Sequence, residues 1–232
     1  MRVLAIGDPH LSRAKPKPMS VFGEGWLGHP EAFFEGWRSV VNDDDLVLVP
    51  GDISWALRFD DAMADLEDLA ELPGEKVLLR GNHDYWWPSI GRLRAALPPR
   101  MHALQNDAIR IGSVVIAGTR GWTCPGTHDF SEQDERIYLR ELERLDLSLS
   151  RAQALLQPGD VSIVMLHFPP TNPRLEPSGF TERIERFAPN ALVFGHVHGG
   201  EGPFAPALAG IDVVYAAADA LRFRPVRVLE TP

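Results

Sequence analysis

The sequence predicts an α/β fold in which strands buried on both faces alternate with amphipathic helices. Short runs rich in Val, Ile and Leu recur along the 232 residues, and most are apolar throughout rather than alternating. Several of these runs are followed by segments with helical periodicity, which is typical of parallel strands joined by crossover helices. We therefore expect an α/β sandwich that is largely parallel at its start. The chain is long enough for one such domain, or at most two.

Several short segments are expected to form strands. Most are plain apolar runs, whereas 109–118 carries Gly112-Ser113 in its interior and is expected to form a hairpin with a tight turn. In chain order the expected strands are 2–7, 45–50, 76–80, 109–118, 161–166, 191–195, 211–217 and 225–230.

The segments between these runs have the periodicity of helices. The expected helices are 31–41, 59–72, 88–97, 131–157 and 181–188. The fourth carries a single apolar stripe from Tyr138 to Leu156, and acidic residues in its first turn complement the helix dipole. This stripe either packs on the protein's own sheet, which is the simpler interpretation, or binds a coiled-coil partner.

Two proline-rich segments, 12–30 and 168–180, interrupt the alternation of strands and helices. We expect each of them to be a long loop. Long loops in compact domains are often functional, so both segments are candidates for the walls of a site.

The composition excludes several classes of protein. With 44% hydrophobic and 24% charged residues the chain is not disordered, and its formal net charge of −9 disfavours long nucleic acid and anionic membranes as partners. Its one cysteine, Cys124, excludes an intramolecular disulfide framework and a cysteine-rich zinc site. The apolar runs are too short for a signal peptide or for a membrane helix of roughly 20 residues. We expect a soluble, cytoplasmic protein, and the sequence leaves its oligomeric state open.

Polar side chains with metal-binding chemistry directly follow five of the expected strands. Taken singly, each has an ordinary explanation as a turn, a helix N-cap, a packed histidine or a surface loop. Open α/β sheets form their ligand crevice at the carboxyl ends of strands, so the joint placement predicts one common site. Imidazoles and carboxylates without a thiolate suit zinc, manganese or iron. The candidate ligands are Asp8, His10, Asp52, Asn82, His167, His196 and His198.

This set of ligands is too large for one tetrahedral ion. Two ions that share a bridging carboxylate would use all of them. A cluster of two ions about 3.5–4 Å apart holds the attacking and leaving oxygens of an in-line displacement and lowers the pKa of a bound water. The residues therefore predict two divalent or trivalent ions.

The motifs resemble those of the calcineurin-like metallophosphoesterase superfamily in their order along the chain. They are Asp8-X-His10, Gly51-Asp52, Gly81-Asn82-His83-Asp84, His167 and Gly195-His196-X-His198. They span residues 8 to 198, and the resemblance implies a four-layer αββα sandwich of two mixed β-sheets flanked by helices, as a single domain over residues 1–232.

The stretches "GDISWA" and "RGNHDYWW" are similar to a bacterial branch of predicted phosphohydrolases, a resemblance that names no substrate. Trp55 stands where many relatives carry a charged residue, so the substrate rules of the family do not transfer to this chain.

The resemblance also implies the ligands of each ion. One ion is held by Asp8, His10, Asp52 and His198, and the other by Asp52, Asn82, His167 and His196. Members of the family hydrolyse phosphomonoesters or phosphodiesters with manganese, iron, zinc or combinations of these. We expect a metal-bridging hydroxide to attack phosphorus directly, without a phosphoenzyme.

His83 is the candidate catalytic residue, because the family pattern leaves it unligated beside Asn82. We expect its imidazole to stabilise the transferring phosphoryl group or to protonate the leaving oxygen. Asp84 is expected to orient that imidazole and raise its basicity.

Four further residues are candidates for contact with the substrate. Tyr85 and Trp86 either stack on a nucleobase or aryl group or are packing residues. Arg120 and Arg58 are candidates for binding phosphate. The expected substrate is a small phosphorylated molecule or a nucleotide, with a phosphoprotein as an alternative.

Two other functions compete with this phosphoesterase activity. Some relatives use this fold as a scaffold for protein binding, as in a retromer subunit, but such relatives lose motif histidines that this chain retains. A nuclease acting on long DNA is disfavoured by the acidic balance and by the absence of a basic stripe.

Overall fold

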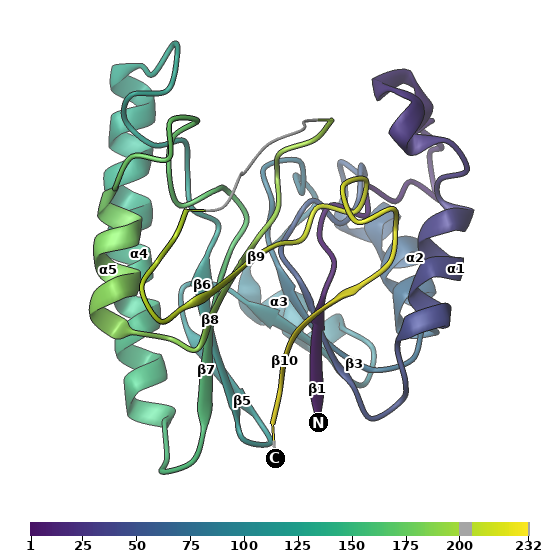
Figure 1. Cartoon of the computed structure of the whole chain (residues 1–232). Helices are drawn as coiled ribbons and strands as arrows, with labels where there is room; N and C mark the ends of the chain where they lie inside the picture. The colour runs from purple at the N-terminus through teal and green to yellow at the C-terminus, as the bar shows by residue number, and fades with distance from the viewer. Residues whose placement is uncertain (200–205, 232) are drawn as a thin grey trace.

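The computed structural model describes residues 1–199 and 206–231 of the chain. Two five-stranded sheets lie face to face, and helices cover the outer side of each sheet (Figure 1). In Figure 1, α4 and α5 lie beside one sheet and α1 and α2 lie beside the other. The predicted αββα sandwich of two mixed sheets is therefore confirmed.

The first sheet has the strand order β10-β1-β2-β3-β4. Its strands β1 to β4 are parallel, whereas β10 arrives from the end of the chain and pairs with β1 antiparallel. The strands are β1 (Arg2–Ala5), β2 (Leu46–Val49), β3 (Glu75–Leu79), β4 (Met101–Leu104) and β10 (Val226–Glu230).

The second sheet has the strand order β5-β6-β7-β8-β9. The hairpin of β5 and β6 is its antiparallel pair, and β6 to β9 are parallel. The strands are β5 (Ala108–Ile111), β6 (Val114–Thr119), β7 (Val161–Leu166), β8 (Ala191–Phe194) and β9 (Asp212–Tyr215).

Five α-helices of the described chain form the outer layers. The helices α1, α2 and α3 pack on the first sheet, and α4 and α5 pack on the second. Side chains at the starts of α4 and α5 form capping boxes that satisfy the free backbone N–H groups of the first turn. The bounds are α1 (Glu31–Val40), α2 (Phe59–Ala70), α3 (Ile90–Ala96), α4 (Glu132–Leu155) and α5 (Gly179–Phe187).

Strands that are apolar throughout supply three separate apolar layers. In β2, Leu46 and Leu48 point between the sheets, while Val47 and Val49 point toward α1 and α2. Strand β7 does the same, since its alternate residues face the other sheet or α4. Successive side chains of a strand point to opposite faces, so each central strand must be apolar at every position.

Most of the expected elements are present, with shifts of a few residues at their ends. The hairpin forms over residues 108–119, one residue beyond the expected segment at each end, and the apolar stripe of α4 packs on its own sheet, so both interpretations are confirmed. Strand β4 is not among the expected strands; it is a four-residue edge strand that contains His102 and follows two prolines. The expected loop 12–30 holds two short 3-10 helices, Met19–Phe22 and Glu24–Trp26.

Among the described residues, no helix combines the length and the hydropathy that a membrane crossing requires.

Candidate metal centre

The carboxyl ends of five strands bring the seven predicted ligands to one place between the two sheets. The first sheet carries Asp8 and His10 after β1, Asp52 after β2 and Asn82 after β3. The second sheet carries the other three, which are His167, His196 and His198. The sandwich thus explains how residues far apart in the sequence become neighbours, because parallel strands end at the same edge.

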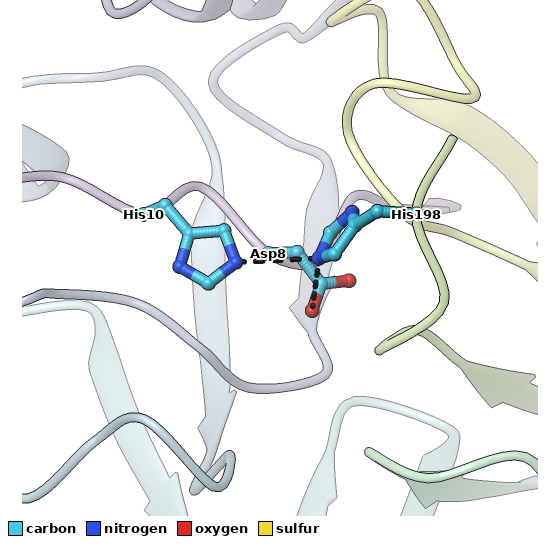
Figure 2. A group of neighbouring side chains, drawn as sticks. All are labelled: Asp8, His10 and His198. Carbon is cyan, nitrogen blue, oxygen red and sulfur yellow. Dashed lines mark hydrogen bonds and ion pairs between the residues drawn. The ribbon is translucent and has the colours of Figure 1, made fainter. Parts of the chain in front are cut away.

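One group of candidate ligands consists of Asp8, His10 and His198, whose ligand atoms all lie within 4.8 Å of one another. Figure 2 shows the rings of His10 and His198 facing each other, with the Asp8 carboxylate beside His198. The two Nε2 atoms are 3.3 Å apart, and His198 Nε2 lies 3.9 Å from Asp8 Oδ1.

A second group consists of Asp52, His167 and His196, again within 4.8 Å. His196 Nδ1 lies 3.2 Å from His167 Nε2, which in turn lies 3.5 Å from Asp52 Oδ1. The carboxamide oxygen of Asn82 is 2.7 Å from His167 Nε2 and adds a neutral oxygen to this group.

The spacing of the ring nitrogens fits a bound metal ion. Two nitrogens that bind one ion tetrahedrally at about 2.1 Å lie about 3.4 Å apart, close to the 3.3 Å between His10 and His198 and the 3.2 Å between His167 and His196.

Burial keeps three of the candidate imidazoles, those of His10, His167 and His196, uncharged. It lowers the pKa of His196 to about 2 and that of His167 to about 3, and it lowers the pKa of His10 well below its usual range. The neutral imidazole is the form that binds metal ions.

The aspartates of both groups are buried beside these uncharged rings. Burial and the charge of Asp52 raise the pKa of Asp8 well above its usual range, and burial also raises the pKa of Asp52. Two buried carboxylates next to neutral imidazoles are stabilised by a divalent cation, so the residues present fit such an ion.

The backbone at four of the candidate ligands adopts the left-handed conformation that side chains rarely occupy. The φ angles are 55° at Asp8, 45° at His10, 51° at Asp52 and 75° at His196. Such strain persists only where surrounding contacts impose it, and it is concentrated at functional sites. Here the backbone N–H of His196 donates to both oxygens of Asp8, at 3.1 and 3.0 Å.

Two glycines leave room for the aspartates. A Cβ atom on Gly81 would lie 2.1 Å from Asp52 Oδ1, and one on Gly195 would lie 2.3 Å from Asp8 Oδ2. Any other residue at either position would displace a carboxylate of the centre.

The Asp84 carboxylate connects the loops that carry Asp52 and Asn82. Oδ1 accepts the backbone N–H groups of Ile53 and Ser54, at 2.8 and 3.1 Å, and the indole N–H of Trp86 at 2.9 Å. Oδ2 accepts the N–H of Gly81 at 2.8 Å. Burial and the charge of Asp52 raise the pKa of Asp84 to about 7, against the effect of these donors.

This arrangement differs from the expectation that Asp84 orients His83. Both oxygens of Asp84 are engaged by other donors, and within residues 1–199 and 206–231 no hydrogen bond joins the two side chains. The Asp84 carboxylate instead joins the two loops that carry the candidate ligands Asp52 and Asn82.

His83 lies at the mouth of the centre. Its backbone N–H donates to Asp52 Oδ1 at 2.8 Å, and its half-buried ring lies between Trp55 and Tyr85, with ring centroids 4.5 and 6.5 Å away. Trp55 also stacks on the His10 ring at 4.8 Å. An aromatic residue thus contacts both a candidate ligand and the candidate acid.

The residues predicted to contact substrate lie in different environments. Tyr85 is 63% exposed beside His83, whereas Trp86 is 2% exposed and holds Asp84. Arg58 is exposed at the N-cap of α2. The backbone oxygen of Arg120 accepts the N–H of His167 at 3.0 Å, which places this arginine next to the second group.

Asp219 is a site residue that was not predicted from the sequence. Its Oδ1 lies 2.9 Å from His198 Nδ1, and its Oδ2 accepts the N–H of Gly199 at 3.0 Å. Burial is the largest single influence and would raise the pKa of Asp219, but the hydrogen bond and charge of His198 together with the backbone N–H donors outweigh it, so the pKa is lowered. Asp219 follows β9 as the other site residues follow their strands, so the same placement rule would have found it.

The sequence matches the family model of calcineurin-like phosphoesterases over residues 1–200, so the chain belongs to that family. Membership implies hydrolysis of phosphoesters with the help of divalent metal ions, and the two Asp/His groups are the candidate residues for binding them.

Several solved structures share the fold. A protein from Thermus thermophilus has a TM-score of 0.58 at 14% identity, with 97% of each chain covered. Phosphopantetheinyl hydrolase from Mycobacterium tuberculosis has a TM-score of 0.54 at 16% identity and covers 100% of this chain and 96% of its own. A protein of unknown function from Aquifex aeolicus also has a TM-score of 0.54 at 16% identity, with 97% of this chain and 95% of its own covered. No curated protein matches the sequence.

Proposed function

We propose that the protein is a phosphoesterase with two metal ions that share the Asp52 carboxylate. The placement of Asp52 carries this proposal, because Oδ2 lies 3.8 Å from His10 Nε2 in one group and Oδ1 lies 3.5 Å from His167 Nε2 in the other. Each oxygen of Asp52 therefore faces a different group, which allows this carboxylate to serve both.

Two ions held there would lower the pKa of a bound water and neutralise charge on the phosphoryl group. In this proposal the first ion is held by Asp8, His10, Asp52 and His198, and the second by Asp52, Asn82, His167 and His196. Asp219 holds His198, and Asp84 holds the two loops that carry Asp52 and Asn82.

His83 donates a proton to the leaving oxygen in this proposal. Its ring is half-buried at the mouth of the centre, and in the described part of the chain neither ring nitrogen is taken by a protein hydrogen bond. The imidazole is thus available to a bound substrate, while its backbone is fixed to Asp52 at 2.8 Å. A positioned acid of this kind contributes about 10²–10⁴-fold to a rate.

Water displaces the leaving group directly in this proposal, without a covalent intermediate on a side chain. Hydrolysis of a chiral phosphorothioate ester in oxygen-18 water is then expected to invert the configuration at phosphorus. Net retention would show two successive displacements and would contradict a single attack by water.

Zinc, manganese and iron are the candidate metals, since imidazole and carboxylate ligands suit all three. The proposed substrate is a small phosphomonoester or phosphodiester. A solved structure with the same fold is named a phosphopantetheinyl hydrolase, so phosphopantetheine esters belong in the first substrate screen beside nucleotides and sugar phosphates.

Metal analysis and hydrolysis test the proposal together. We expect about two ions per chain by elemental analysis, with turnover of p-nitrophenyl phosphate or its bis-ester after loading with manganese. His83→Ala is expected to keep its metals and lose turnover, whereas Asp8→Ala is expected to lose metal. His128→Ala is the control, because that side chain is 92% exposed. A protein that binds two ions, leaves all esters untouched and captures a protein partner would instead be a scaffold.

A further inference from the structure

A pocket of about 80 Å³ lies beside the metal centre and holds three arginines. It is formed where β3, β4 and β6 end, and one side of α4 closes it. The side chains that matter are Arg80, Gln105, Arg120, Glu141 and Arg144. We call this group the arginine pocket.

The charges of the arginine pocket do not balance. Glu141 is its one carboxylate, and it is bound by Arg144 Nη1 at 2.6 Å, by the Thr119 hydroxyl at 2.5 Å and more distantly by Arg120 Nη2 at 3.5 Å. Three guanidinium groups thus face a single negative charge. This excess of positive charge is local, because the chain as a whole carries a net charge of −9.

Two of the guanidinium groups are incompletely bonded. The Nε atoms of Arg80 and Arg120 are both buried, and neither has a hydrogen-bond partner in the described residues. A buried N–H group without an acceptor costs free energy, and guanidinium groups bind carboxylates and phosphates through paired N–H groups. The pocket therefore contains two guanidinium N–H donors that no protein acceptor among the described residues satisfies.

Gln105 adds a further donor to the pocket. Its Oε1 accepts the indole N–H of Trp87 at 2.8 Å, and because an indole can only donate, this bond identifies which atom of the carboxamide is oxygen. The NH₂ group of Gln105 remains to donate. The side chains thus offer guanidinium and amide donors and keep their single carboxylate occupied.

The arginine pocket shares its backbone with the metal centre. Arg80 lies two residues before Asn82, and the backbone oxygen of Arg120 accepts the N–H of His167 at 3.0 Å. Asn82 and His167 both belong to the second group of candidate ligands. One extended ligand can therefore reach both places along the same edge of the sandwich.

We infer that the arginine pocket binds a second anionic group, a phosphate or a carboxylate, of the substrate whose phosphoester is hydrolysed at the metal centre. This inference rests on the proposed phosphoesterase function. It assigns Arg80, Arg120 and Arg144 to substrate selection and defines the substrate class as molecules with two separated anionic groups.

Alkane-1,n-bisphosphonates of increasing chain length provide the test, because they carry two anionic groups and cannot be hydrolysed. Each is compared with the monophosphonate of the same length as an inhibitor of p-nitrophenyl phosphate hydrolysis and as a ligand in calorimetric titration of the metal-loaded protein. At one chain length we expect the bisphosphonate to bind at least about tenfold more tightly, the effect of one added charge-assisted hydrogen-bonded pair.

Arg80→Gln is expected to abolish this gain, and Arg80→Lys to restore part of it through charge alone. Arg151→Gln, an exposed arginine on α4 outside the pocket, is the matched control and is expected to keep the gain in full. Thermal melts verify that each variant is folded.

The outcomes separate the inference from the function on which it rests. Suppose that esters are hydrolysed but no bisphosphonate binds more tightly than its monophosphonate, or that Arg80→Gln retains the tighter binding of the bisphosphonate. In either case the arginine pocket is not a substrate site. If no ester is hydrolysed, the phosphoesterase proposal fails. The calorimetric difference between the wild type and Arg80→Gln then shows whether the pocket binds anions, and its absence overturns the inference as well.

Discussion

The Asp219 carboxylate fixes the ring of His198, with Oδ1 of the aspartate 2.9 Å from Nδ1 of the histidine. This bond directs Nε2 of the same ring toward His10 and Asp8, the other two candidate ligands of the first group. A carboxylate behind a histidine ligand sets the tautomer and orientation of the ring and increases its basicity.

Replacing Asp219 by alanine is therefore expected to weaken metal binding by about 10–100-fold while leaving the fold intact. Competition with a chromophoric chelator measures this affinity. Asp212→Ala, at an exposed position of β9, is the matched control and is expected to bind metal as the wild type does. Equal affinities in the two variants would show that His198 does not need this carboxylate.

The Asp84→Asn substitution tests the connection between the two ligand loops. An asparagine keeps one acceptor oxygen, but its NH₂ group would face the N–H of Gly81, which now donates to Oδ2. Leaving buried donors unpaired costs about 1–3 kcal/mol, so we expect a loss of this size in the free energy of unfolding measured with urea. Asp60→Asn, with its side chain 89% exposed, is expected to change stability by less than about 0.5 kcal/mol.

Gly195→Ala is expected to displace the Asp8 carboxylate. The added Cβ atom would lie 2.3 Å from Asp8 Oδ2, and no rotation of the methyl group relieves that contact. We expect weakened metal binding in the calorimetric titration. Gly91→Ala in α3 meets no atom within 4 Å and is expected to retain metal binding and gain roughly 0.5–1 kcal/mol of stability. Full metal affinity in Gly195→Ala would contradict the proposed role of Asp8.

The burial of Lys76 is expected to make the free energy of unfolding depend on pH, without any involvement of the metal centre. The side chain is buried in β3 with its ammonium group donating to the Leu72 carbonyl, and burial lowers its pKa to about 8. The unfolded chain, with an ordinary lysine pKa of about 10.4, binds more protons between these two values. The contribution of Lys76 to stability therefore rises as the pH increases from about 8 toward 10.4.

Urea unfolding at pH 7.5 and pH 10 measures this effect. The difference in unfolding free energy between the wild type and Lys76→Met is expected to shift by about 2 kcal/mol in favour of the wild type at the higher pH. A difference that stays constant across this range would show that Lys76 has an ordinary pKa in the folded protein.

The sequence predicted the sheets well because local pattern and tertiary environment agree there. Leu46 to Val49 are apolar at every position, and the strand they form is covered on both faces. Strand β4 was missed because only four residues form it and His102 interrupts its apolar character; pairing with β3 supplies the stability that its composition lacks.

The ligand candidates were found because each follows a strand, whereas their supporting contacts could not be read from local sequence. The bonds from Asp84 to Ile53 and Ser54 depend on how two loops meet, and the adjacency of His83 in the sequence suggested a different partner. Trp86 similarly looked available for a substrate, but it lies in the core with its N–H on Asp84. The roles in binding and catalysis stay predictions until the variants are measured.

Each group of candidate ligands takes residues from both sheets. Asp8 and His10 come from the first sheet and meet His198 from the second, while Asp52 from the first meets His167 and His196 from the second. Bound ions would accordingly cross-link the two sheets and resist their separation. The free energy of unfolding would then increase with the concentration of free metal. It would increase by about 2.7 kcal/mol when the free metal concentration is a hundred times the dissociation constant of a single site. Hydrogen exchange with and without a chelator measures this cross-link. Removal of the metal is expected to reduce the protection of backbone amides in both sheets together.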